Sequence, residues 1–527
     1  MGTGPSAAGA ALALVGMPSI NVTILDVGGE LEAENAQVRT RMSTAEPGTW
    51  RSEDLEIVAP LPRNRDPRSL PRKQICGSNF PFDDFGQLSG VSAKATTNNL
   101  LVSGAYGGFS NIWGAQVMPW STQSFRDWPL SRSEMEPHYR EILSHIPYAG
   151  VEDDLEEFFP LFGIPSALPK IAERSQWVLD RYGAHRMKSR RYGVTFGAAR
   201  LAFDAPSCRR CGLCMSGCPY QLIYSASQTI SALRAAGHVK YLPNLRVDAV
   251  RETDGGQPKI YATSVKDGST FQMRADKVLL GAGAIGSTRI AANSLGRFNA
   301  NFSMHESAQF VTPFLSKRPT ATLQQSGEFT LNQFNIYLQR NGSRDNSSLI
   351  HCYPYNDIMM TSLPKFLSSP SLGVVARRAM RHLTVGLGYL PSWASPSLAV
   401  RVGSEKTDGS LPDVEISGVN NPLALPTLRD VTARLRKIGV AIDLFPLPGQ
   451  TKLSGPAKSY HFGGSFPHAN DAMTASSSDL LGRPIGWRNT HLIDGSVFPT
   501  IAATTFTLTI MANAHRIASE IARVRTT

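Results

Sequence analysis

The chain has 527 residues, of which 42% are hydrophobic and 18% charged, a profile typical of a globular protein with two or three domains. This profile excludes a disordered or fibrous chain, and no apolar run reaches the roughly 18 residues needed to cross a bilayer. The formal net charge is +11, but the basic residues are scattered and runs such as 188–191 have the character of solvated surface, so we expect no nucleic-acid partner.

The chain opens with the pattern G-x-G-x-x-A at residues 2–7, followed by an Ala-rich helix and by a strand at 20–25 that ends in Asp26. Glycines such as Gly2 and Gly4 permit a tight turn and let the backbone approach a pyrophosphate at the helix N-terminus. An acidic residue about 20 positions further on suits a ribose hydroxyl. The pattern predicts a dinucleotide site, and the alternative is that these glycines only serve turn geometry.

A dinucleotide fingerprint ordinarily follows a strand, and Met1 leaves no room for one. We therefore expect an incomplete N-terminus, from which the first strand and any export signal are missing. The apolar stretch 7–15 has no basic residues before it, which indicates a buried helix rather than a signal peptide. We expect a cytoplasmic protein, with association with a membrane as the alternative.

Four of the six cysteines lie within eleven positions, in the spacing C-x2-C-x2-C-x3-C-P of bacterial ferredoxins. They are Cys208, Cys211, Cys214 and Cys218. Such crowding indicates metal or cluster ligation rather than a disulfide framework, and it predicts an iron–sulfur cluster. A zinc site and four structural thiols are the alternatives.

Further along, residues 277–287 form a strand that runs into a second Gly-rich turn and a helix. Residues 491–500 form a strand and a loop ahead of a helix at 507–522. Between these segments, residues 363–393 combine apolar positions with Arg377, Arg378 and Arg381. We expect a core helix there, and the alternative is a basic amphipathic segment in peripheral contact with a membrane or a partner.

Taken together, these segments resemble the glucose–methanol–choline oxidoreductases, in the order of that family. The matching segments are 2–8, 26–29, 107–111, 281–287 and 494–509, and the likeness fades between about 305 and 458. The resemblance implies an α/β fold with a Rossmann-like FAD-binding domain made of residues 1–35, 86–120, 195–300 and 480–527, including the cysteine loop 208–219. A second, α+β substrate domain is expected from residues 121–194 and 301–479.

The resemblance also implies FAD as the cofactor, with its pyrophosphate on Gly2 and Gly4 and its ribose on Asp26. The other expected cofactor contacts are Gly108, Ser110 and Asn111 near the isoalloxazine, Val247 near the adenine, Gly283, and Asp494 beside the flavin. Some related sugar oxidases tether FAD through a histidine directly before a tryptophan. Ile112 stands in that place, before Trp113, so we expect FAD to be non-covalent.

His461 lies in the segment 459–465, which resembles the segment that carries the family's catalytic histidine. An imidazole suits the removal of a hydroxyl proton because its unperturbed pKa lies near neutrality. Thr505 stands where the family usually has a second His or Asn, and because a hydroxyl is a poor proton acceptor, the second catalytic group stays open. We expect His305, His468 and His491 to have structural roles.

The segment 214–224 looks like the cluster loop of the iron–sulfur sugar dehydrogenases, the fructose and glucose dehydrogenase catalytic subunits, which carry a three-iron cluster. Here Cys208 and Cys211 are spaced rather than adjacent, so a [4Fe–4S] and a [3Fe–4S] cluster both stay open.

Three functional hypotheses follow from these patterns. The first is a dehydrogenase that oxidises an alcohol or a sugar and passes electrons from FAD through the cluster to a quinone or an electron-acceptor protein such as a cytochrome. The second is an oxidase that uses oxygen directly, with structural or zinc-bound cysteines. The third is a non-catalytic electron-transfer flavoprotein, and the motif around His461 argues against it.

Overall fold

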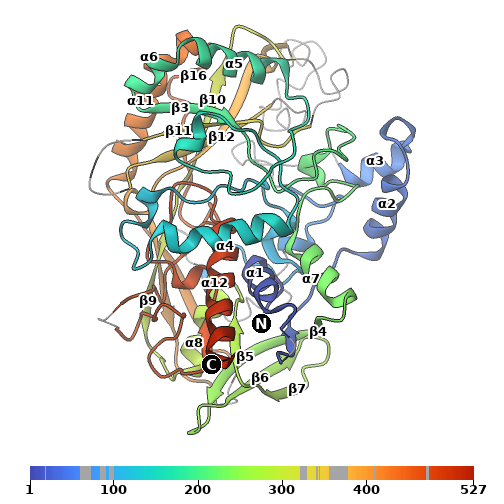
Figure 1. The fold of residues 1–527 in the computed structure, drawn as a ribbon, viewed down its shortest axis with the longest axis vertical. Coiled ribbons are helices and arrows are strands. Elements are labelled where there is room, and N and C mark those ends of the chain that lie inside the picture. The colour runs from blue at the N-terminus through green and yellow to red at the C-terminus, as the bar shows by residue number, and fades with distance from the viewer. Residues whose placement is uncertain are drawn as a thin grey trace.

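The computed structural model of the chain describes residues 1–17, 19–59, 73–82, 91–93, 100–320, 329–339, 342, 345–354, 378–407, 410–470 and 474–526. Helices and several sheets are mixed, as the sequence predicts for an α/β protein. Helices α1 (Pro5–Leu14), α8 (Ala284–Ser294) and α12 (Thr507–Thr526) lie in the lower half of Figure 1. Helix α11 (Ala424–Ile442) lies in the upper half with the largest sheet, and α4 (Arg132–His145) crosses between the halves.

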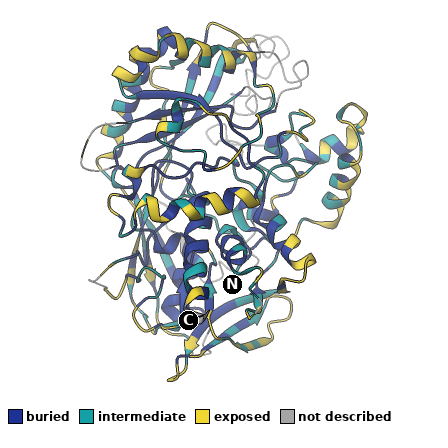
Figure 2. Cartoon of the chain, viewed as in Figure 1, coloured by how far each residue is buried: buried dark blue, intermediate teal, exposed yellow. Residues whose placement is uncertain are grey.

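The chain also contains shorter helices and three smaller sheets. The other helices are α2 (Ala33–Ser43), α3 (Ser52–Val58), α5 (Glu173–Ala184), α6 (Arg186–Arg191) and α7 (Ala226–Ala235). Strand β1 (Val22–Leu25) pairs in parallel with β4 (Val239–Leu242). Strand β8 (Val278–Leu280) pairs in parallel with β19 (Thr490–Leu492). Strands β5 (Leu245–Glu252), β6 (Pro258–Ser264) and β7 (Thr270–Arg274) form an antiparallel sheet. Figure 2 shows exposed residues on α2, on one side of α4 and on the outer sides of α5, α6 and α11 at the top of the view.

Met1 and Gly2 lie between the two parallel pairs. Gly2 N–H donates to Leu25 O at 2.9 Å, and Gly281 N–H donates to Met1 O at 3.1 Å. The Met1 ammonium donates to Leu279 O at 2.7 Å. Gly2 has φ +87°, and a Cβ there would lie 2.5 Å from Gly281 O, so this position requires glycine. Two residues thus make hydrogen bonds that a central strand would otherwise provide.

Helix α1 is buried on nearly every side, as predicted for the Ala-rich stretch. Its first residue is Pro5, which suits the first turn because an N–H there has no intrahelical partner. Small side chains let α12 approach closely, and Figure 1 shows the two helices side by side. A Cβ on Gly9 would lie 2.2 Å from Met511 O. The crossing of α1 and α12 therefore depends on a glycine in the middle of α1.

The largest sheet runs in the order β16 (Phe445–Pro446), β10 (Gln309–Leu315), β13 (Leu383–Tyr389), β12 (Ser348–Tyr353), β11 (Phe334–Leu338) and β3 (Val194–Ala198), with β17 (Lys452–Leu453) also paired to β10. Opposite residues of its antiparallel strands share a face. One face carries Phe196, Ile336, Ile350 and Phe310 and packs on α11 in one hydrophobic cluster. The other face carries Asn335, His351 and Tyr389, which follows from the strand register.

A second sheet has the order β18 (Phe462–Gly463), β9 (Asn301–Glu306), β14 (Ser397–Val402), β15 (Val414–Val419) and β2 (Val91–Ala93). Only Ser307 and Ala308 separate β9 from β10, so they join the two large sheets. Ser307 N–H donates to His461 O at 2.9 Å, and Leu390 N–H donates to Ala308 O at 3.0 Å. This link brings the residue before β18 next to the end of β13.

The helix expected at 363–393 is wrong for residues 383–389, while residues 378–380 are helical. Residues 355–377 lie outside the described residues, and Leu383–Tyr389 forms strand β13, which pairs with β10 and β12. Glycines explain the strand, because a Cβ on Gly388 would lie 2.1 Å from Phe310 Cζ and one on Gly386 2.6 Å from Phe314 Cε2. A strand with partners on both sides also excludes the surface amphipathic alternative for these seven residues.

A search of the described helices finds none that is both long enough and apolar enough to cross a membrane. The domain boundaries given above stay predictions.

Replacing Gly9 by Ala should destabilise the protein. Because the added Cβ would overlap the Met511 carbonyl, α1 and α12 must separate, and overpacking of this kind costs about 1–3 kcal/mol. Thermal unfolding of Gly9→Ala should show a lowered Tm. Gly183→Ala is the matched control, since Gly183 is an exposed residue of α5 with open space at its Cβ, and alanine there should leave the Tm unchanged or raise it. Equal Tm values for Gly9→Ala and the wild type would contradict the close helix crossing.

Candidate functional site

The predicted site for the pyrophosphate, called the cradle below, lies at the start of α1 and includes Gly2 and Gly4. No side chain caps this helix, so its first N–H groups keep their capacity to bind an anion. Gly4, its N-cap, has open space where a Cβ would lie. A Cβ on Gly108 would lie 3.6 Å from the Gly4 Cα, so the two predicted glycines approach each other closely. The structure therefore brings together the N-terminal turn and the loop at 107–111.

Asp26 follows β1 and lies next to this turn, as predicted. Its carboxylate is buried and accepts a hydrogen bond of 2.5 Å from Thr3 Oγ1, together with backbone N–H groups of Val27 and Gly28. Burial raises the pKa of Asp26 to about 7, because these donors only partly replace water around the charge. Thr3 Oγ1 in turn accepts from Gly107 N–H at 2.9 Å. Thr3 thus connects Asp26 to the 107–111 loop.

The loop residues predicted to meet the isoalloxazine fold back on the protein. The Ser110 hydroxyl donates to Gly107 O at 2.6 Å and accepts from Ala226 N–H at 2.8 Å, at the start of α7. The Asn111 amide donates to Tyr106 O at 3.0 Å and to Gly108 O at 2.8 Å. These side chains therefore fix the shape of the loop, and the backbone of Gly107 and Gly108 is what they position.

The three remaining predicted cofactor residues lie on elements around the same cradle. Val247 is buried on β5 at a break in the strand register. Gly283 is the N-cap of α8, with φ +76° and open space at its Cβ. Asp494 is buried and accepts from Ser287 Oγ at 2.5 Å and from Ser496 N–H at 2.9 Å. Burial raises the pKa of Asp494, which faces the positive charge of the Met1 ammonium.

His461 lies at the end of a strained loop. Ala457 (φ +66°) and Tyr460 (φ +57°) both adopt the left-handed conformation that non-glycine residues rarely use. The buried carboxylate of Glu306, the last residue of β9, accepts from Ala457 N–H at 2.9 Å and from Ser459 Oγ at 2.7 Å. The Ser459 hydroxyl then accepts from His461 N–H at 3.1 Å. This chain of hydrogen bonds holds the loop, and with it the imidazole.

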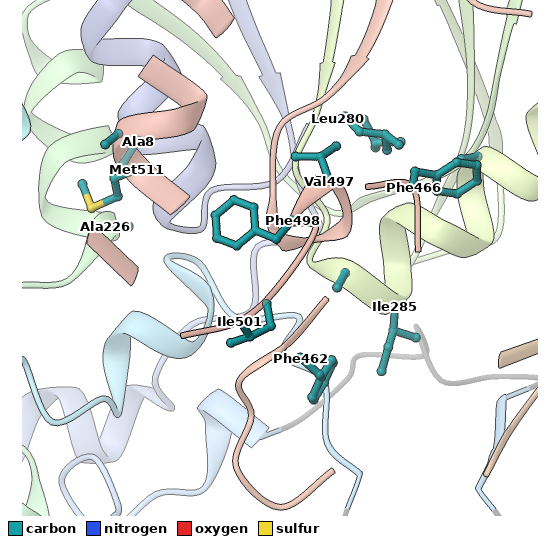
Figure 3. Packing of buried hydrophobic residues seen from close by; sticks show 14 of the residues in the cluster. Ala8, Ala226, Leu280, Ile285, Phe462, Phe466, Val497, Phe498, Ile501 and Met511 are labelled. Carbon is teal, nitrogen blue, oxygen red and sulfur yellow. The ribbon is translucent and has the colours of Figure 1, made fainter. Parts of the chain in front are cut away.

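The imidazole of His461 lies between two aromatic rings. It stacks on Tyr389 with centroids 4.6 Å apart and contacts Phe506 at 4.7 Å. Its Nδ1 is buried and has no hydrogen-bond partner. Burial lowers the pKa of His461 to about 3, so the ring is neutral at physiological pH. Figure 3 shows Phe462, the residue after His461, and Ile501, both members of one hydrophobic cluster.

Contacts on either side connect His461 to the other predicted groups. The Phe109 ring of the 107–111 loop lies 5.4 Å from the Tyr460 ring. Thr505, the predicted second group, directly precedes Phe506, and its hydroxyl is buried without a partner, as is that of Thr504. The Thr505 carbonyl accepts from Trp120 Nε1 at 3.2 Å. The structure therefore places His461, Thr505 and the 107–111 loop in one neighbourhood.

The other histidines differ from His461 in their partners. His468 uses both ring nitrogens, with Asp479 O at 2.7 Å and Asn513 Nδ2 at 3.1 Å. His305 lies on β9, paired with Gly463. His491 contacts Leu481 O through Nδ1, while its Nε2 is buried without a partner.

Sequence reasoning missed the side chains that face His461 from the large sheet. His351 on β12 is buried, its Nε2 has no hydrogen-bond partner, and its ring lies 5.5 Å from Tyr389. The signal in the sequence was alternation, because Asn335 and Tyr337, like His351 and Tyr353, are polar positions two apart within otherwise apolar strands. That pattern shows that one face of each strand is polar, but it does not show what the face meets.

The four clustered cysteines are all described, and none is in a disulfide. Backbone N–H groups point at their sulfurs, from Arg210 to Cys208 and from Thr330 to Cys214, each at 3.4 Å. Burial raises the pKa of Cys211 to about 12 and that of Cys218 to about 11. Among the described residues, however, no three Cys, His, Asp or Glu side chains converge in a group that could hold a metal ion. The donor chemistry fits a metal, but the arrangement does not, and the predicted cluster is not confirmed.

Lys73 lies beside this cysteine loop. Its ammonium donates to Trp113 O at 2.7 Å, and burial lowers its pKa to about 8, an effect that nearby Cys214 and Cys218 oppose. Lys73 therefore connects the cysteines to the segment that follows the 107–111 loop.

The buried neutral imidazole of His461 should make stability depend on pH. Its folded pKa of about 3 lies below the unfolded value near 6.5, so the unfolded chain binds more protons between these values. Above pH 6.5 the imidazole is neutral in both states and does not lower the free energy of unfolding. As the pH falls from 6.5 toward 3, the unfolded chain is protonated first, and the free energy of unfolding decreases. The wild type should therefore lose stability relative to His461→Gln by up to about 1.4 kcal/mol per pH unit.

Denaturant unfolding of both proteins between pH 7.5 and 4.5 measures this difference. His238→Gln, at an exposed position, is the control and should follow the wild type at every pH. Parallel curves for the wild type and His461→Gln would show that the imidazole is not held neutral by burial.

Comparison with known proteins gives one informative result. No family model matches the sequence, and a search of curated proteins finds no match. Among solved structures, the chain is similar to pyridoxine 4-oxidase from Mesorbium loti, with a TM-score of 0.59 and 14% identity over 98% of this chain and 97% of that one. At this identity the likeness establishes the fold. The chain therefore has the predicted α/β fold, like that of pyridoxine 4-oxidase.

Proposed function

We propose that the chain is an FAD-dependent oxidoreductase that converts a CH–OH group of an alcohol or sugar into a carbonyl. The observation that carries this proposal is His461, a neutral imidazole with an unpartnered buried Nδ1, held next to the loop that meets the N-terminal cradle. The shared fold supports it, since the similar structure is that of an oxidase, pyridoxine 4-oxidase. A protein that only carries electrons would not need a strained loop to present a base.

The residues of the cradle fit FAD. Gly4 and Gly283 leave open space at helix N-termini, where phosphates bind favourably. Asp26 is a buried carboxylate with a raised pKa, and hydroxyl donors from a ribose would stabilise its charged form. FAD, when bound, supplies an acceptor for the hydride that leaves the carbinol carbon.

The chain's own residues account for the proton. We assign His461 as the base that takes the hydroxyl proton, since its ring is neutral and is positioned by Ser459 and Glu306. The O–H bond breaks as the C=O bond forms, and the proton stays on the imidazole. The free hydroxyls of Thr504 and Thr505 offer hydrogen bonds to the substrate oxygen. Tyr389 and Phe506 pack against the imidazole, and His461 is only partly exposed.

The acceptor of the electrons divides this proposal into two candidates. Oxygen is the first, in line with the structural likeness to an oxidase, and it requires nothing of the cysteines. An iron–sulfur cluster on the cysteine run is the second, and the backbone N–H groups that point at the sulfurs favour it, because thiolate ligands are stabilised by such donors. No step is derived through the cluster, since the thiols do not converge on a metal.

Gly4→Val should abolish flavin binding without destabilising the fold. The valine side chain would enter open space, so the free protein should keep its Tm, but it would fill the cradle. Gly48→Val, at an exposed glycine with equally open surroundings, is the control. Flavin absorbance after incubation with FAD and desalting measures the effect, and acid precipitation should release the wild-type flavin into the supernatant. Normal flavin content in Gly4→Val would place the cofactor elsewhere.

His461→Ala should slow anaerobic flavin reduction by roughly 10²–10⁴-fold, the usual contribution of a general base, while FAD stays bound. Thr505→Ala should cost less, because a hydroxyl contributes only hydrogen bonding. Stopped-flow reduction with a reactive alcohol gives the rate constants. His238→Ala, at an exposed position, should match the wild type. An unchanged rate in His461→Ala would remove this residue from the role of base.

If an iron–sulfur cluster is the electron acceptor, protein purified anaerobically should contain iron and sulfide. Cys211→Ser and Cys214→Ser should lose both and should keep substrate-driven flavin reduction. Cys352→Ser is the control, because Cys352 packs in the hydrophobic cluster under α11, whereas Cys208 and Cys214 pack in a different cluster, and the metal content should stay unchanged. Zinc in place of iron, or no metal at all, would leave oxygen as the acceptor.

A further inference from the structure

The polar face of the large sheet lies against the candidate active site. Across neighbouring strands it presents Asn335 on β11, His351 on β12 and Tyr389 on β13, the first two as register partners. All three are buried, with exposed fractions of 0%, 2% and 6%. The opposite face of the same strands is apolar and covered by α11, so this polar face is the side directed toward His461.

The Tyr389 ring contacts both His351 and His461. Tyr389 lies 4.6 Å from His461 and 5.5 Å from His351, and each imidazole has one buried nitrogen without a partner. Burial lowers the pKa of His351 to about 3, and the neighbouring His461 lowers it further in the same direction. Both rings are therefore neutral, and each has an unused donor or acceptor.

Two side-chain amides next to Asn335, those of Asn332 and Gln116, also have buried atoms without hydrogen-bond partners; together with His351 they are called the wall below. Asn332 Nδ2 donates to Gln116 Oε1 at 2.8 Å and to Asn335 Oδ1 at 2.7 Å. Its own Oδ1 and the Nε2 of Gln116 are buried and have no partner. A buried polar atom without a partner costs about 1–3 kcal/mol, and native proteins leave few of them. Several of them in one neighbourhood indicate a partner that comes from outside the chain.

The strands β3, β10, β11, β12 and β13 place no Asp, Glu, Lys or Arg on this face. The charges next to it are paired with one another: the Asp153 carboxylate, which lies against Gly197, is 3.5 Å from the buried Arg200, and Glu156 is 3.3 Å from it. Two nitrogens of Arg200, Nε and Nη1, have no hydrogen-bond partner, but two carboxylates already compensate its single charge. A charged group bound against this face would therefore find no uncommitted counter-ion and would be desolvated at a cost. An uncharged ligand with hydrogen-bonding groups would satisfy the orphaned atoms without that cost.

We propose that His351, together with Gln116 and Asn332, binds the polar end of the substrate and selects uncharged alcohols that carry a second hydrogen-bonding group. This inference rests on the proposed function, because it names the substrate class of the same site. His351 hydrogen-bonds the second polar group of the substrate, while His461 meets the hydroxyl that is oxidised. Alcohols with a carboxylate, phosphate or ammonium at that end are excluded by desolvation.

The test is calorimetric titration of the FAD-loaded protein, and of the protein as purified, with a matched set of benzylic alcohols. Pyridine-4-methanol and 4-(hydroxymethyl)phenol add a neutral polar group, benzyl alcohol adds none, and 4-(hydroxymethyl)benzoate adds a charge. The two neutral polar probes should bind the wild type at least tenfold more tightly than the other two. His351→Leu should remove this preference, and His351→Gln, which keeps a donor and an acceptor, should retain most of it.

His491→Gln is the control, since it changes another buried imidazole with an unpartnered Nε2, far along the chain in β19, and should keep the wild-type preference. Equal affinity for the benzoate, no binding of the neutral probes, or a wild-type preference in His351→Leu would overturn the proposal. Because titration measures binding without turnover, the proposed oxidation and the proposed role of His351 in selectivity can be refuted independently. Selective binding without flavin reduction would refute only the proposed function, and flavin reduction without dependence on His351 would refute only the wall.

Discussion

Glu306 lies at the end of β9 with its carboxylate buried, and it accepts hydrogen bonds from the backbone and side chain of the loop before His461. The next residue, Ser307, donates its N–H to the His461 carbonyl. One short stretch of chain therefore both restrains a loop with two left-handed residues and joins the two large sheets. Because the free energy for that strain comes from the surrounding hydrogen bonds, the position of the imidazole is a property of the whole fold.

Desolvation then determines what the positioned groups can do. It keeps His461 and His351 neutral, and it raises the pKa values of Asp26, Asp494 and Glu306. A neutral imidazole is the form that accepts a proton, and a buried carboxylate is the form that gains most from hydroxyl donors. If the proposed function is correct, the same burial that costs stability in the free protein prepares the site for a cofactor and an uncharged substrate.

The sequence predicted the parts of the site that depend on local turns. The glycines at 2 and 4, the helix that follows, Asp26 after a strand, and the turn at 281–287 all lie where the pattern indicates, because each requirement is satisfied within a few residues. His461 was found through resemblance, and no local pattern shows that Glu306, some 150 positions earlier, holds its loop. The roles of these residues in binding and catalysis stay predictions.

The parts that sequence reasoning missed depend on pairing between distant segments. Leu383–Tyr389 reads as an apolar helix until its glycines are seen to accommodate Phe310 and Phe314 of a neighbouring strand. The polar face around His351 is defined by strand register, which periodicity alone does not give. Cysteine spacing predicted ligation, but convergence of thiols depends on the loops between them, and the described thiols do not converge.

The most direct test of the central claim is anaerobic mixing of the FAD-loaded protein with pyridine-4-methanol and with D-glucose, followed through the visible absorption of the flavin. The account predicts that at least one alcohol bleaches the flavin and yields one carbonyl product per flavin reduced. Flavin that binds but stays oxidised with every alcohol, or protein that binds no flavin, would contradict it.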